Sequence, residues 1–271
     1  MKLKRPLNYY GGKYTMLPII EPLIPNHKTY VEGCAGGAAL FFYKEPSTVE
    51  VLNDTNRNLI CFYKQLKHNF KELNALVQDT LHHQGEFNKA REIYNNPHNY
   101  SELERAWSVW VGANMSFGGA MFSGSFQITT NSNDISHPGS KTNYKRIEFD
   151  KGLFLKRIEK AMILEIDILK VLDKFNNEDI FHYIDPPYFQ ANQGHYKGYT
   201  KQDFINLLEK ASDNKSKIMI SCYYDDLIND FHKFNIQMHE RSLGVKAGEK
   251  KTEIILTNYE LPKNNKQTVL W

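Results

Sequence analysis

The chain has 271 residues, of which 41% are hydrophobic and 24% charged, a composition typical of soluble globular proteins. A net charge of only +3 excludes a strongly basic chain, so any surface for nucleic acid must be local. No apolar run is long enough to span a bilayer, and the three cysteines lack metal-ligand spacing. We therefore expect a metal-free protein of a reducing cytosol, with no membrane segment.

Residues 1–64 have the pattern that begins a parallel α/β sheet. The predicted elements are a helix at 15–23, a strand at 29–31, a glycine turn at 32–37, a helix start at 38–43 and a strand at 48–52. The order of strand, glycine turn, helix and strand is typical of a parallel sheet with crossover helices.

The middle of the chain has a different character. Apolar residues at helical spacing predict a long helix over 58–81, and a second helical stretch covers 107–113. Residues 114–146 are rich in Gly, Ser, Thr and Asn, which predicts a hairpin or a long loop. We interpret 65–154 as an insertion in the sheet domain.

The α/β pattern then resumes. The predicted elements are strands at 161–169, 180–184, 217–223 and 253–259, with a helix at 204–211. Strand 180–184 is followed by Asp185-Pro186-Pro187-Tyr188. The two prolines end the strand, because proline lacks a backbone donor and has a fixed φ. The sequence thus places a carboxylate and an aromatic ring on a stiff turn at a strand end.

The glycine turn after the first strand suggests a ligand without phosphate. Glu32-Gly33-Cys34-Ala35-Gly36-Gly37 is not a strict G-x-G-x-x-G, and Glu32 would repel a pyrophosphate but attract an ammonium group. Asp54 follows the next strand near the offset of about 20 residues at which an acid binds ribose hydroxyls. The alternatives are a plain tight turn and a helix N-cap at Asp54. S-adenosylmethionine fits this pattern better than NAD.

The segment Asn8-Tyr9-Tyr10-Gly11-Gly12-Lys13 precedes the first strand. Its aromatics, glycines and lysine suit a ligand with a carboxylate. Taken alone, it is equally a hydrophobic turn with a surface lysine.

Four motifs together resemble those of the Dam-type DNA adenine methyltransferases, the D12 class and α-group of N6-adenine enzymes. The motifs are "PLNYYGGK", "YVEGCAGGAALFF", "VLND" and "YIDPPY", in this order. The likeness covers roughly 1–64 and 155–259, and DPPY after a strand is its most specific part. "EGCAGGAA" departs from the Pro-Phe-X-Gly-X-Gly pattern of many relatives, keeping the acid and two glycines.

The resemblance implies a fold and a domain organisation. We expect a Rossmann-like, mostly parallel, seven-stranded sheet with helices on both faces. Residues 1–64 and 155–271 would form the catalytic, S-adenosylmethionine-binding domain, and 65–154 the target-recognition domain, mainly helical and loop-rich.

The resemblance also implies the cofactor site. Asp167 would hold the adenine amino group of the cofactor, with Ile168 packing on its ring; Asp167 is otherwise a surface acid at a strand end. The expected cofactor residues are Tyr9, Tyr10, Gly11, Lys13, Glu32, Gly33, Ala35, Gly36, Asp54, Asp167, Ile168 and Asp185.

The DPPY motif has a chemical rationale. An exocyclic amine is a poor nucleophile because its lone pair is delocalised into the ring. Asp185 and the Pro186 carbonyl would accept its two hydrogens and orient the lone pair toward the methyl group, while Tyr188 stacks on the flipped base. The catalytic residues are therefore expected to be Asp185, Pro186 and Tyr188.

Double-stranded DNA is the expected partner, with target readout from 114–146. The segment 106–140 has no Arg or Lys, the commonest guanine readers, so we expect Asn or Gln to read adenine. Lys145 or Arg146 would supply a guanine contact from the flank of this segment. The candidate DNA contacts are Arg91, Asn114, Gln127, Asn131, Lys141, Lys145, Arg146, Tyr196, Lys197 and Lys250. The family also implies a cytoplasmic enzyme of a bacterium or phage, either monomeric or paired with a restriction endonuclease.

Several alternatives remain open. N4-cytosine methylation uses the same geometry, although those enzymes usually have Ser before PPY. RNA or protein-glutamine amino methylation is a further enzymatic alternative. A non-catalytic DNA-binding protein on a methyltransferase scaffold is disfavoured by the intact Asp185 and Tyr188, and a dinucleotide dehydrogenase by the missing phosphate turn.

Overall fold

The computed structural model describes residues 2–9, 11–128, 137–190, 198–240 and 252–261, without the side chains of 237–240. The chain divides into two compact units. Met1–Tyr14, Gly36–Pro46 and Asp54–Glu165 form the first, which we call the helical unit. Thr15–Ala35, Ser47–Asn53 and Ile166–Trp271 form the second, the sheet unit.

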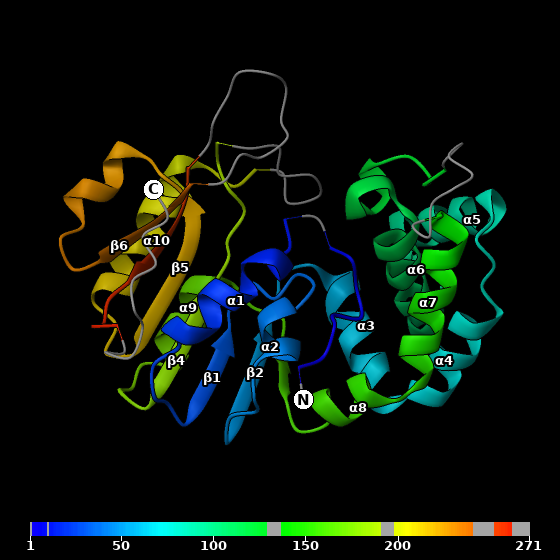
Figure 1. Cartoon of the computed structure of the whole chain (residues 1–271), viewed down its shortest axis with the longest axis horizontal. Helices are drawn as coiled ribbons and strands as arrows, with labels where there is room; N and C mark the ends of the chain where they lie inside the picture. Colours follow the sequence, from blue (N-terminus) through cyan, green and yellow to red (C-terminus); the bar gives the residue numbers. More distant parts are fainter. Residues whose placement is uncertain (1, 10, 129–136, 191–197, 241–251, 262–271) are drawn as a thin grey trace. The chain divides into compact units, whose positions relative to one another are not determined.

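Seven strands form one sheet in the order β3-β2-β1-β4-β5-β7-β6 (Figure 1). The strands are β1 Thr29–Glu32, β2 Val49–Asn53, β3 Met162–Leu164, β4 Ile180–Ile184, β5 Lys217–Tyr223, β6 Asn235–Glu240 and β7 Thr252–Thr257. β1 is parallel to β2 and β4, and β4 is parallel to β5. β7 is antiparallel to β5 and β6. The expected Rossmann-like, mostly parallel seven-stranded sheet is confirmed.

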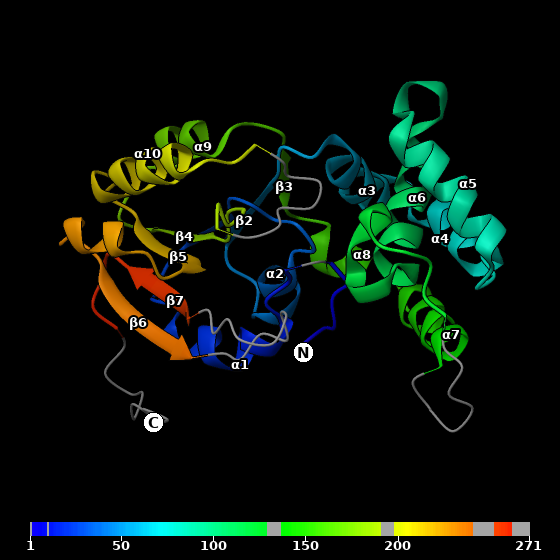
Figure 2. The same cartoon turned by 90° about the horizontal axis from the view of Figure 1, so that it is seen from above.

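Helices cover both faces of the sheet. Figure 2 shows α1 (Leu17–Ile20) on one face, and α9 (Ile168–Lys174) and α10 (Lys201–Ser212) on the other. α10 begins at a capping box in which Thr200 and Asp203 exchange hydrogen bonds, a strong helix start. Its apolar residues recur at helical spacing and pack against Ile184 and Ile220 in the core.

The helical unit is built around α6 (Glu102–Met115). This helix begins at a Ser101–Glu104 capping box and is buried from Ala106 to Met115. The helices α3 Arg57–His68, α4 Phe70–Asp79, α5 Gln84–Asn95 and α7 Pro138–Asp150 pack against it, and the unit also contains α2 Ala39–Tyr43 and α8 Leu153–Ile158. No helix in the described part of the chain is long and apolar enough to cross a membrane.

Among the differences from the sequence prediction, we describe four. The helix predicted over 58–81 is two helices, because the backbone leaves the helical region at Asn69. The strand predicted over 161–169 is only three residues long, because Asp167 caps α9, which begins at Ile168. The strand β6 has no counterpart in the prediction.

The fourth difference lies in the segment 114–146. A hairpin is present, since Ser116 and Phe126 form an antiparallel bridge. However, the loop prediction is wrong from residue 138, where α7 begins. Pro138 suits the first turn of a helix, and the His137 side chain accepts a hydrogen bond from Gly139 N. The helix was not predicted because most residues of α7 are polar and follow a loop-like sequence.

The central strand β4 contains a buried histidine with a lowered pKa. His182 is fully buried, and its Nε2 lies 2.7 Å from the Phe175 carbonyl oxygen. Burial lowers the pKa of His182 to about 4. Between this value and the ordinary pKa near 6.5, the unfolded chain binds more protons than the folded one. Stability should therefore rise with pH across this window and be lost as the pH falls.

We expect His182→Gln to flatten this pH dependence. The amide can still donate to Phe175 but does not titrate. Between pH 6.5 and pH 4, the free energy of unfolding should fall by about 3 kcal/mol more for wild type than for the variant. Urea unfolding at each pH measures this difference. Replacement of the exposed His232 by Gln is the control. Parallel pH profiles for His182→Gln and wild type would refute this origin of acid sensitivity.

Candidate active site

Two acidic residues lie at the same edge of the sheet. Glu32 is the last residue of β1, and Asp185 directly follows β4. β1 and β4 are adjacent and parallel, with Glu32 opposite Tyr183. The carboxyl ends of parallel strands are where open α/β sheets bind their ligands. The fold thus places both predicted site acids where a ligand would bind.

Asp185 and Tyr188 contact each other across the two prolines. The Tyr188 hydroxyl lies 3.2 Å from Asp185 Oδ1 and 3.0 Å from Glu253 Oε1. Tyr188 is partly exposed as a residue, but burial of its hydroxyl, followed by the charges of Asp185 and Glu253, raises its pKa well above the ordinary value. The phenol therefore remains protonated and acts as a hydrogen-bond donor.

Glu32 is a buried acid. Its side chain is 2% exposed, and Oε2 accepts a hydrogen bond of 2.7 Å from the Tyr30 hydroxyl. Burial and then the charge of Glu32 raise the pKa of Tyr30 well above its ordinary value. A carboxylate in this setting attracts a cationic group and repels an anionic one.

The glycine turn after β1 uses its amides internally. Gly33 N donates to the Tyr183 carbonyl at 3.0 Å, and Ala35 N donates to the Asn53 carbonyl at 2.8 Å. Gly36 N donates to Asp54 Oδ2 at 2.8 Å. A phosphate site needs several such amides directed at the ligand. The structure therefore agrees with a ligand that has no phosphate bound at this turn.

Asn53 contacts the glycine turn and is absent from the residues predicted from the sequence. Its Nδ2 donates to the carbonyls of Gly33, at 2.8 Å, and Ile166, at 2.9 Å. Its Oδ1 accepts from Ile166 N at 3.1 Å. Asn53 thus joins the glycine turn to the segment that leads into α9. A buried amide at a strand end, directly before Asp54, was the available signal.

Asp54 is buried and holds local backbone. Besides Gly36 N, its carboxylate accepts Asn56 N through Oδ1 at 2.8 Å. Asp54 does not cap α3, because that position belongs to Asn56. The helix-cap alternative is therefore wrong, and the predicted ribose contact stays a prediction.

The N-terminal segment packs within the helical unit. Tyr9 is buried against the glycine turn, since a Cβ on Gly36 would lie 3.2 Å from its ring. Lys13 is 6% exposed, and its Nζ donates to the exposed Gly11 carbonyl at 3.0 Å. The alternative of a surface lysine is therefore wrong. Tyr10 lies outside the described residues.

Asp167 and Ile168 lie at the start of α9. Asp167 is exposed, and its Oδ1 accepts a hydrogen bond of 2.8 Å from Leu169 N. The Ile168 side chain lies so close to Gly33 that a Cβ there would collide with its Cδ1. The structure therefore brings Ile168 and the glycine turn together, within the sheet unit.

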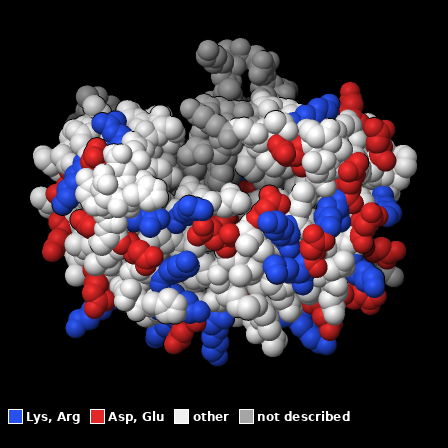
Figure 3. Space-filling view, turned by 180° about the vertical axis from the view of Figure 1, so that it is seen from behind, with Lys and Arg blue, Asp and Glu red and all other residues white. Residues whose placement is uncertain are grey.

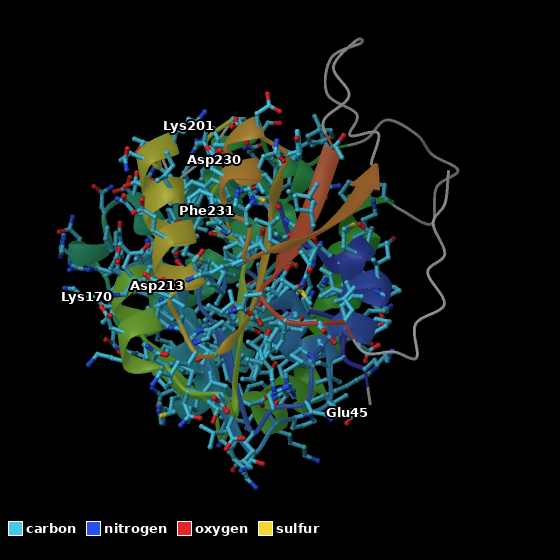
Figure 4. The ribbon with its side chains drawn as sticks, turned by 90° about the vertical axis from the view of Figure 1, so that its left-hand side faces the viewer. Glu45, Lys170, Lys201, Asp213, Asp230 and Phe231 are labelled. Carbon is cyan, nitrogen blue, oxygen red and sulfur yellow. The ribbon has the colours of Figure 1, made fainter. Side chains whose placement is uncertain are left out.

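The described segment after Tyr188 is held by polar contacts. Gln190 Nε2 donates to Asp225 Oδ2 at 3.1 Å, and Lys201 pairs with Asp225 Oδ1 at 3.2 Å. Asp225 caps the 3₁₀ turn Asp226–Asp230, and Figure 4 labels Asp230 in this turn and Lys201 on α10. These contacts fix the chain on both sides of residues 191–197.

Three residues predicted to contact DNA form hydrogen bonds within the helical unit. Asn114 is buried; its Nδ2 donates to the Pro6 and Trp110 carbonyls, and its Oδ1 accepts Asn8 N. Lys145 donates to the Arg5 carbonyl at 3.2 Å, and burial lowers its pKa to about 8. Arg146 donates to the Gln78 carbonyl. The Asn114 side chain is buried, whereas Lys145 and Arg146 are partly exposed, so their contacts with DNA stay predictions.

The other candidates for DNA contact are more accessible. Arg91 and Lys141 are exposed on α5 and α7, and Gln127 is partly exposed. Asn131, Tyr196, Lys197 and Lys250 lie outside the described part of the chain. On the face in Figure 3, described Lys and Arg side chains are interspersed with Asp and Glu rather than gathered in one field.

Comparisons with known proteins are consistent with this geometry. A family model described as "D12 class N6 adenine-specific DNA methyltransferase" matches residues 9–247. "Type II methyltransferase M1.LlaDCHI" of Lactococcus lactis subsp. cremoris is 30% identical over 92% of this chain and 93% of its own. "Type II methyltransferase M.MjaIII" of Methanocaldococcus jannaschii is 25% identical over 96% of this chain and all of its own. "DNA N-6-adenine-methyltransferase" of Escherichia phage P1 is 25% identical over 78% of this chain and 28% of its own.

Proposed function

The chain belongs to the family of D12 class N6 adenine-specific DNA methyltransferases, and from this we propose that Asp185, Pro186 and Tyr188 form its catalytic group. The observation that supports these assignments is the placement of Asp185 directly after β4, with its carboxylate 3.2 Å from the Tyr188 hydroxyl. The enzyme methylates N6 of adenine in DNA.

Asp185 and the Pro186 carbonyl would accept the two hydrogens of the target amine. Both acceptors stand on a turn stiffened by two prolines, so little reorganisation is needed during the reaction. As the nitrogen becomes positively charged, the nearby carboxylate stabilises that charge. The partly exposed Tyr188 would stack on an adenine flipped out of the duplex, as chemistry on a base requires.

S-adenosylmethionine supplies the methyl group as an electrophilic sulfonium, and S-adenosylhomocysteine is its product. Glu32 fits the positively charged end of this cofactor, and the occupied amides of the glycine turn fit its lack of phosphate. Gly33, Ala35 and Ile168 would line the same site, and Asp167 would bind the adenine amino group. We assign Tyr9, Tyr10, Gly11, Lys13, Gly36 and Asp54 as the remaining cofactor residues. The described residues hold no cluster of three or more His, Cys, Asp or Glu arranged for a metal, and the proposed transfer involves none.

Double-stranded DNA would contact the accessible candidates. We retain Arg91, Gln127, Lys141, Asn131, Tyr196, Lys197 and Lys250, together with the partly exposed Lys145 and Arg146, and we remove Asn114 because its buried side chain supports the fold. The target-recognition role of 65–154 belongs to this proposal. Two of the named relatives come from a bacterium and a phage, which supports a bacterial or phage origin. A cytoplasmic location, and a monomer or a pairing with an endonuclease, also belong to this proposal.

Methylation of a plasmid, followed by long-read sequencing, tests this function. Plasmid is prepared from cells without methyltransferases and treated with purified protein and S-adenosylmethionine. We expect N6-methyladenine in one sequence context. Modification of cytosine N4 would support the alternative chemistry, and an unmodified plasmid, despite cofactor binding in a calorimeter, would support a non-catalytic scaffold. Heat-inactivated protein is the control.

A further inference from the structure

A third acid, Glu253, contacts the proposed catalytic group from another strand. Glu253 lies in β7 opposite Tyr223 of β5, and its side chain is 3% exposed. The Tyr223 ring packs edge-on against Tyr188, with centroids 4.5 Å apart. The pairing of β5 with β7 thus places Glu253 beside the end of the Tyr188 ring.

The Tyr188 hydroxyl has one proton and lies within hydrogen-bond distance of two carboxylates. Its oxygen lies 3.0 Å from Glu253 Oε1 and 3.2 Å from Asp185 Oδ1. A phenol donates one hydrogen bond at a time. Donation to Asp185 would occupy one lone pair of Oδ1 and would withdraw negative charge from the carboxylate that accepts the target amine. Donation to Glu253 leaves this oxygen to the amine.

We propose that Glu253 is a positioning residue of the methyl transfer, which takes the hydrogen bond of Tyr188 and thereby leaves Asp185 to accept the target amine. The same contact fixes the stacking ring at its hydroxyl end. This inference rests on the proposed catalytic role of Asp185. Glu253 acts through Tyr188 and need not touch the substrate.

The arrangement has an electrostatic basis. The raised pKa of Tyr188 comes from burial and from both carboxylates, so the donor keeps its proton at working pH. An amide in place of Glu253 would be a weaker acceptor and could donate to the phenol oxygen. Either effect turns the phenol proton toward Asp185.

A double-mutant cycle tests the inference. Glu253→Gln should lower the single-turnover rate of methyl transfer about ten-fold or more, the scale of a hydrogen bond to a charged group. Tyr188→Phe should lower it to a similar extent, because the ring loses its anchor. The double variant should be no slower than the slower single variant, since both changes remove one interaction.

The readout separates positioning from folding. Reactions start from enzyme saturated with S-adenosylmethionine and DNA, so that damaged protein lowers the amplitude and lost positioning lowers the rate constant. Glu50→Gln is the matched control, because Glu50 of β2 is also buried, at 7% exposure, and accepts a hydrogen bond from Ser47 N. Its rate constant should equal that of wild type.

Several outcomes would overturn the inference. They are a wild-type rate constant for Glu253→Gln or for Tyr188→Phe, and losses that multiply in the double variant. If Glu253→Gln does not fold, Tyr188→Phe still decides, because it removes only the hydroxyl. An active Asp185→Ala would instead defeat the proposed function, whereas an inactive Asp185→Ala with a fast Glu253→Gln would defeat this inference alone.

Discussion

Asp185→Ala is expected to lower the rate of methyl transfer by about a thousand-fold or more, the scale of removing a preorganised electrostatic group. The variant loses the carboxylate that accepts the target amine at the end of β4. Asp185→Asn should be similarly impaired, because its amide presents hydrogens to an amine that needs acceptors. Single-turnover transfer of labelled methyl to DNA measures both rates.

Folding should survive this change. β4 is completely buried before Asp185, so its packing does not depend on that side chain. Thermal unfolding checks the fold, and calorimetric binding of S-adenosylmethionine measures how much Asp185 contributes to the cofactor site. Asp213→Ala is the control, since Asp213 is exposed and pairs with Lys233 at 3.0 Å (Figure 4). Rapid transfer by Asp185→Ala would contradict the assigned mechanism.

Asn53→Ala is expected to weaken S-adenosylmethionine binding at least about ten-fold and to destabilise the fold by about 2–4 kcal/mol. The change removes the three hydrogen bonds to Gly33 and Ile166. It leaves buried carbonyls without their donor and frees the glycine turn from the segment that leads into α9. Calorimetry and urea unfolding measure the two effects.

Asn53→Asp separates the bonds that Asn53 donates from the one that it accepts. The acid can still accept a hydrogen bond from Ile166 N but cannot donate to either carbonyl. We therefore expect cofactor affinity and stability to fall nearly as much as in Asn53→Ala. Asn74→Ala is the control, because Asn74 forms an exposed hydrogen bond of 2.7 Å with Asp150 on the helical unit. Unchanged cofactor affinity in both Asn53 variants would show that the hydrogen bonds of Asn53 do not contribute to the cofactor site.

Local patterns predicted the parts of the fold that depend on local physics. Apolar runs and helical spacing identify β4, β5 and α10, and two prolines end β4 at Asp185. Start signals that resemble polar loop residues were missed, as at Pro138 of α7. The prediction made β3 too long for a similar reason, because Asp167 is the N-cap of α9 and lies within an apolar run.

The amino-acid sequence was sufficient for the family, the strand that precedes Asp185 and the chemistry of its motif, because these depend on residues adjacent along the chain. Tertiary structure alone showed that Asn114 is buried and that Lys145 and Arg146 form hydrogen bonds within the helical unit, since polar residues look alike in sequence whatever their partners. It also brought Glu253 to Tyr188 and Asn53 to Ile166. Such contacts join residues distant in the chain, and only the pairing of strands and the packing of loops determines which polar atoms meet.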